Sequence, residues 1–122
     1  MKAVTVNQLK KELITCNPNE LVELCLRLSK FKKENKELLT YLLFESNDES
    51  GYIESVKDEI NEQFENINTN SYFYIKKSVR KILRLIKKFS RYSLKKETEV
   101  ELLLYFCLKL KEFNPSIQRN TT

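Results

Sequence analysis

Basic side chains dominate residues 72–96 and are the first candidates for chemistry in this sequence. The stretch contains ten lysines and arginines and no acidic residue. At the α-helical step of about 100° per residue, six of them fall on one face. This basic face consists of Lys77, Arg80, Lys81, Arg84, Lys88 and Arg91. Lysine and arginine on one helix face neutralise backbone phosphates with little sequence preference, so this is a candidate phosphate- or partner-binding surface.

Three interpretations of the basic face stay open. The simplest is a solvated surface, offset by the acidic segment that precedes it in the sequence. The second is nucleic-acid binding, although only Tyr72, Tyr74 and Tyr92 lie near enough to stack on bases and no known nucleic-acid module is recognisable. The third is an acidic protein partner. A membrane surface would need the apolar face of the same helix, which we expect to be committed to the core.

Carboxylates gather in residues 45–67, which hold eight acidic residues and one lysine. Glu54, Asp58, Glu62 and Glu65 recur at helical spacing and define an acidic face. Such groups could hold Mg²⁺ or Ca²⁺ or perform acid–base catalysis. However, residues 46–51 lack the ligand order of an EF-hand loop. We therefore expect a solvated helix face, whose edge could pair with the basic face at about 0–1 kcal/mol per exposed pair.

Histidine is absent, which removes the commonest general base and metal ligand. Cys16, Cys25 and Cys107 are an odd number and form no CxxC pair. We interpret them as small core residues of a protein in the reducing cytoplasm. The sequence thus predicts no enzyme, no catalytic or metal-binding residue and no cofactor.

One glycine and two prolines in 122 residues favour helices joined by short polar links. Hydrophobic periodicity predicts an all-α fold, either a compact bundle or a short HEAT-like array of five to six antiparallel helices. We expect a single domain over residues 1–115 and a flexible polar tail over residues 116–122. The predicted helices cover residues 6–14, 18–30, 33–44, 52–66, 71–91 and 96–113, with a polar loop over residues 46–51.

The predicted helices differ in how clearly they show a buried side. The fourth predicted helix has a narrow apolar stripe that consists of Ile53, Val56, Ile60 and Phe64. The fifth has an apolar seam with steps of four and three residues, which consists of Ile75, Val79, Ile82, Ile86 and Phe89. Residues 102–108 of the sixth helix are apolar on every side, which indicates a central helix or a subunit interface. In the second case Tyr105 and Phe106, which point to different sides, are the candidate homodimer contacts.

The first two predicted helices carry a resemblance. The segments Val6-Asn7-Gln8-Leu9-Lys10-Lys11-Glu12-Leu13 and Asn17-Pro18-Asn19-Glu20-Leu21-Val22-Glu23-Leu24 are similar to the opening of several uncharacterised bacterial helical families. The similarity covers about the first 30 residues. It implies a helical hairpin of unknown function and transfers no functional residue.

These patterns favour a non-catalytic helical module that binds another protein or a second copy of itself. The alternative is binding to a nucleic-acid backbone through residues 76–91. We expect no membrane partner, because the longest apolar run, residues 102–108, falls far short of the roughly 20 residues that span a bilayer.

Overall fold

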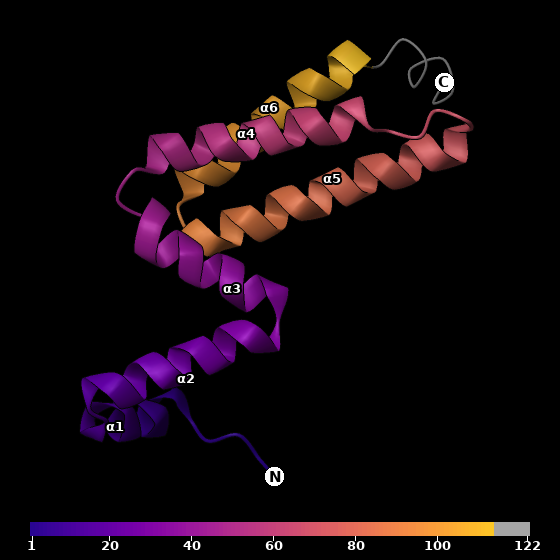
Figure 1. The fold of residues 1–122 in the computed structure, drawn as a ribbon. Helices are drawn as coiled ribbons and strands as arrows, with labels where there is room; N and C mark the ends of the chain where they lie inside the picture. Colours follow the sequence, from indigo (N-terminus) through magenta and orange to yellow (C-terminus); the bar gives the residue numbers. More distant parts are fainter. Residues whose placement is uncertain (114–122) are drawn as a thin grey trace. The chain divides into compact units, whose positions relative to one another are not determined.

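The computed structural model describes residues 1–113 and divides the chain into two compact units, Met1–Thr40 and Tyr41–Thr122. The predicted all-α fold is confirmed: across the described residues there are six α-helices, one π-helical turn and no strand (Figure 1). The choice between a bundle and a HEAT-like array stays a prediction, as does the single domain over residues 1–115. The tail predicted for residues 116–122 lies outside the part that is described.

The N-terminal unit contains α1 (Val6–Thr15), α2 (Pro18–Phe31) and α3 (Lys33–Thr40). Reciprocal side-chain caps begin the first two helices. The Thr5 hydroxyl accepts from the Gln8 backbone N–H, and the Gln8 side chain accepts from the Thr5 N–H. Asn17 and Glu20 make the same exchange, both at 2.9 Å. Each cap satisfies backbone donors that a helix leaves unpaired at its start, which confirms the predicted first helical turns.

The three helices of this unit enclose no core. The Asn35 side-chain amide donates to the Leu28 carbonyl at 2.8 Å, and α2 packs against α3. Nevertheless, none of residues 1–40, all of which are described, is buried. A segment of this length is too small to bury a substantial apolar interior alone.

The second unit contains η1 (Tyr41–Glu45), α4 (Glu49–Glu65), α5 (Tyr72–Ser93) and α6 (Lys96–Phe113). Successive α-helices run in opposite directions, and α6 packs against both α4 and α5 (Figure 1). A π-helical hydrogen bond from the Ser46 N–H to the Tyr41 carbonyl, at 2.8 Å, forms η1. This turn was expected to continue the preceding α-helix.

The core of the second unit follows the predicted stripes. Ile60 and Ile86 are fully buried, and Ile82 and Leu102 are 1% and 0% exposed. The stripe of α4 is buried throughout, whereas Val79 and Phe89 on α5 are only partly buried. The Tyr52 ring lies 4.6 Å from the Tyr41 ring, centroid to centroid. The three α-helices therefore share one hydrophobic core.

The predicted loop over residues 46–51 is wrong at its C-terminal end, because α4 begins at Glu49. Asp48 is the N-cap, and its Oδ1 accepts from the Gly51 N–H at 3.1 Å. A Cβ atom at residue 51 would lie 2.4 Å from Asp48 Oδ2. A side chain at residue 51 would therefore require the Asp48 carboxylate to shift. Gly51 lies in the first turn of α4 and not in a loop.

Two further predictions need correction. The fifth helix runs two residues beyond its predicted end and stops at Leu94, whose φ of 57° is left-handed. Its N–H still donates to the Ser90 carbonyl, which caps the helix in the way that glycine usually does.

The interpretation of the cysteines as core residues is wrong: Cys25 and Cys107 are exposed and Cys16 is half-buried, and all three are free thiols. The amphipathic pattern identified the helices but not what covers each side.

Candidate functional site

The basic face lies on the side of α5 opposite the core. Lys77, Arg80, Lys81, Arg84 and Arg91 are all exposed. Lys88 is half-buried, and its Nζ lies 5.0 Å from the centroid of the neighbouring Phe89 ring. Five of the six predicted residues therefore present their charges to solvent along one helix, and Lys88 is the exception.

An aromatic ring that the sequence analysis missed extends the basic face. Phe73 lies one turn before Lys77, is 68% exposed, and packs edge-on against Tyr74 with ring centroids 5.5 Å apart. Of the tyrosines considered for stacking, Tyr92 is buried and Tyr72 is half-buried. The periodicity of α5 places Phe73 with the cations, and this was the signal that could have identified it.

Tyr105 and Phe106 do not form an exposed interface. Phe106 is buried in the core, where its ring centroid lies 6.0 Å from that of Phe64. The Tyr105 hydroxyl donates to Asn61 Oδ1 at 2.7 Å, and Lys57 Nζ lies 5.1 Å from the Tyr105 ring centroid. These contacts attach α6 to α4. The exposed apolar residues of α6 are instead Val100, Leu104 and Leu108, which we call the α6 stripe.

Charged groups between α4 and α6 serve the packing of these helices. Lys57 Nζ lies 2.8 Å from Glu101 Oε2 and 3.6 Å from Glu54 Oε1. The hydrogen bond to Glu101 raises the Lys57 pKa, although partial burial opposes it. The acidic face points outward: Glu54, Asp58, Glu62 and Glu65 are exposed. Pairing between the edges of the acidic and basic faces stays a prediction.

Glu49 is the centre of a polar cluster at the start of α4. Its carboxylate accepts hydrogen bonds from the Tyr41 hydroxyl at 2.8 Å and from the Thr98 hydroxyl, and Lys95 Nζ lies 3.7 Å away. Burial alone would raise the Glu49 pKa, but the hydrogen bonds and the lysine charge outweigh it and lower the pKa. Burial and the neighbouring carboxylate raise the pKa of Tyr41 to about 12. The cluster joins η1, α4 and α6 and leaves no group positioned as a nucleophile.

Glu49→Gln should remove an acid-sensitive part of the stability. Because the folded pKa of Glu49 lies below its ordinary value of 4.5, this stability is present above that value and is lost as the pH falls through the folded pKa. We expect the variant to be about 1–2 kcal/mol less stable at pH 7. The difference should shrink towards pH 3 in urea denaturation series. Glu62→Gln, on the exposed side of α4, is the matched control, and an equal pH response in both variants would contradict the role of Glu49.

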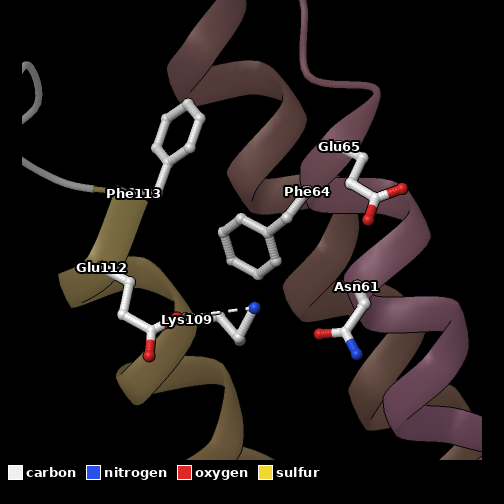
Figure 2. Close-up of a pocket in the computed structure, with 6 residues that line it drawn as sticks. All are labelled: Asn61, Phe64, Glu65, Lys109, Glu112 and Phe113. Atoms are coloured by element: carbon white, nitrogen blue, oxygen red, sulfur yellow. Dashed lines mark ion pairs between the residues drawn. The ribbon is translucent and has the colours of Figure 1, made fainter.

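A shallow pocket of about 400 Å³ lies between α4 and α6. Figure 2 shows Phe64 and Phe113 on one side of it and the ion pair of Lys109 with Glu112 below them. The Lys109 Nζ and Glu112 Oε2 atoms are 3.5 Å apart. Asn61 and Glu65 also line it. The lysine is already paired, and none of the described residues that line the pocket carries a hydroxyl or a thiol, so these residues offer no activated nucleophile.

Among residues 1–113, the N-terminal unit has more exposed large apolar side chains than the second unit. We call them the N-terminal apolar surface: Val6, Leu9, Leu13 and Ile14 of α1, Val22, Leu24, Leu26, Leu28 and Phe31 of α2, and Leu38 of α3. Phe31 is 77% exposed and Val6 is 82% exposed. On α2, Leu24, Leu28 and Phe31 share one side, and Val22 and Leu26 lie on the other. Patches of exposed apolar side chains usually mark a binding surface.

Within residues 1–113, no group of three or more acidic or cysteine side chains could hold a metal ion. The same residues contain no helix with the length and apolar character needed to cross a membrane.

Comparison of the chain with protein-family models, with curated proteins and with solved structures finds no match. The resemblance of the first two helices to uncharacterised bacterial helical families therefore stays a prediction.

Proposed function

We propose that the chain is a non-catalytic interaction module that binds another protein through the N-terminal apolar surface. The observation that carries this proposal is that residues 1–40 bury no side chain while two of their helices expose apolar residues along their length. Burial of apolar area stabilises association by about 25 cal/mol per Å² before the costs of binding. A partner that covers these residues would supply the core that this unit lacks.

The charge around this surface indicates what kind of partner fits. Residues 1–40 contain eight basic and five acidic residues, for a net charge of +3. We therefore propose a protein partner whose apolar patch is bordered by acidic side chains, since complementary charge favours encounter and orientation. The three free thiols fit a reducing compartment, the cytoplasm.

A matched pair of variants tests the proposal. Leu28→Asp with Phe31→Asp places charge on the apolar side of α2, whereas Arg27→Gln with Lys30→Gln makes the same change in net charge elsewhere on that helix. Proteins captured by the tagged full chain are compared between the variants, and each candidate is purified for calorimetry. We expect direct binding that is at least tenfold weaker for the first variant only, which is about 1.4 kcal/mol. Equal binding by both variants, or no direct binding, would overturn the proposal.

Nucleic-acid binding through the basic face is the second candidate function. The observation that favours it is the exposed Phe73 ring beside five exposed cations on the same side of α5. Base stacking on an aromatic side chain next to a basic groove is typical of proteins that bind single strands without sequence preference. We therefore propose single-stranded nucleic acid, rather than a duplex, as the ligand in this case.

Lys81→Glu with Arg84→Glu should weaken binding to a fluorescent oligothymidine at least tenfold at low salt, because two phosphate contacts become repulsive. Fluorescence anisotropy at two salt concentrations measures the affinity and its salt dependence. Lys10→Glu with Lys11→Glu on α1 makes the same change in net charge and should have much less effect. Phe73→Ala should weaken single-strand binding and leave duplex binding unchanged. Equal losses in both double variants would indicate a response to net charge alone and would remove the basic face as a site.

A further inference from the structure

The outward side of α6 carries a regular apolar row. Val100, Leu104 and Leu108 are 54%, 65% and 52% exposed, and they follow one another at intervals of four residues. The opposite side of the helix, with Leu102 and Phe106, is buried against α4 and α5. Residues four apart form a continuous ridge on a helix surface, and such ridges are what helices pack against one another. Among the described residues of its own unit, the α6 stripe is therefore a ridge without a partner.

Opposite charges lie at the two ends of this ridge. Glu97 is in the first turn of α6 and Lys111 is in the last turn, and both are exposed. Each is seven residues from Leu104, and seven residues are close to two helical turns, so both charges lie on the same side as the stripe. The ridge is thus acidic at one end, apolar in the middle and basic at the other end.

This order is complementary to itself when reversed. If a second α6 lies antiparallel with its Leu104 opposite the first Leu104, Val100 of each helix faces Leu108 of the other. The same register places Glu97 of each helix opposite Lys111 of the other. A parallel arrangement would instead set Glu97 against Glu97 and Lys111 against Lys111, and like charges in contact are unfavourable. The order of charged and apolar residues therefore favours a second copy of α6 as the partner of this ridge, and it favours the antiparallel direction.

We propose that the α6 stripe is the contact surface of a homodimer, in which two copies of α6 pack antiparallel about a two-fold axis at Leu104. A two-fold interface uses the same patch on both subunits, which is what the symmetric order of residues provides. One helix ridge is smaller than the roughly 800 Å² per partner of a standard interface, so dissociation constants on the order of 10 to 100 µM are expected. This surface is separate from the N-terminal apolar surface, so the inference does not depend on the proposed function.

Cysteine cross-linking tests the register. In a background with Cys16→Ser, Cys25→Ser and Cys107→Ser, the substitution Leu104→Cys brings two thiols together at the axis, and mild oxidation should give a disulfide-linked dimer. Val100→Cys in the same background is the matched control. In the antiparallel register the two copies of residue 100 are eight residues apart along the axis, about 12 Å, which is too far for a disulfide. Cross-linking at residue 104 but not at residue 100 supports the proposal. Equal cross-linking at both positions, or none at residue 104, overturns it.

Sedimentation equilibrium tests the charges in the chain with its natural cysteines kept reduced. Glu97→Lys should weaken the dimer, and adding Lys111→Glu should restore it, because the reversed pair is again complementary. Circular dichroism checks that the helices remain folded in both variants. A chain that stays monomeric up to about 500 µM, well above the expected dissociation constant, would overturn the homodimer and leave the α6 stripe to a different protein.

Discussion

Leu102→Ala should lower the free energy of unfolding of the second unit by roughly 2–5 kcal/mol. Leu102 is 0% exposed and lies in the core that α4, α5 and α6 share, so truncation removes buried methyl groups and leaves a cavity. The loss is large because folded domains have a total stability of only about 5–15 kcal/mol. Urea denaturation followed by circular dichroism at 222 nm, where α-helices have a strong negative band, measures the change.

Leu104→Ala is the matched control, because it makes the same chemical change two residues away on the same helix. Leu104 is 65% exposed, and truncation of such a side chain should cost less than about 0.5 kcal/mol. Both variants are measured at low micromolar concentration, below the expected dissociation constant of the dimer. Similar losses in the two variants would mean that the two sides of α6 are equally buried, contrary to the structure.

The core of the second unit could be predicted because two of its helices have an unambiguous apolar side. Ile60 in α4 and Ile86 in α5 lie on stripes with helical periodicity, and both are fully buried. The sixth helix has apolar residues on every side, so periodicity could not distinguish its buried side from its outward side. For this reason the sequence leaves a core helix and an interface both open and makes Phe106, not Leu104, a candidate contact in the second case, whereas Phe106 is buried and Leu104 is exposed.

Local chemistry decided the other differences. The polar composition of residues 46–51 indicates a loop, but the Asp48 carboxylate caps the Gly51 N–H and starts α4 at Glu49. The basic face could be predicted because charge at helical spacing on an amphipathic helix points away from the core. The helical period also places Phe73 on that face, where it is 68% exposed, but an analysis of charges alone does not find it.

The N-terminal helices show what an amphipathic pattern leaves open. Their capping residues, Thr5 with Gln8 and Asn17 with Glu20, act over three residues, so the starts of α1 and α2 could be predicted. Their apolar residues would suit the packing of these helices into a core. Instead, Leu13 is 43% exposed and Leu28 is 62% exposed. An apolar stripe requires a covering surface, but it does not specify whether that surface belongs to the same chain or to another.

The difference in burial between the two units should appear as a large difference in amide hydrogen exchange. The helices α1, α2 and α3 have 10, 14 and 8 residues. Isolated helices shorter than about 12–15 residues are marginal in water, and these three gain little from tertiary burial. We expect their amides to open at a cost of about 0–2 kcal/mol, and amides beside Ile60 and Ile86 to approach the global stability. The resulting protection should differ by roughly 100-fold or more.

Exchange measured by mass spectrometry on peptides from residues 6–31 and 53–86 checks this expectation in the full chain. Amides on the exposed side of α5 serve as an internal control. Their hydrogen bonds face solvent as those of α1 do, but the other side of α5 is buried, so a difference in protection between the two helices reports on burial. Equal protection of the two units would mean that the N-terminal apolar surface is covered in the free chain, which would remove the main support for the interaction module. Low protection that rises when a purified partner is added would show that binding supplies the missing burial, because ordering of these helices would then be linked to association.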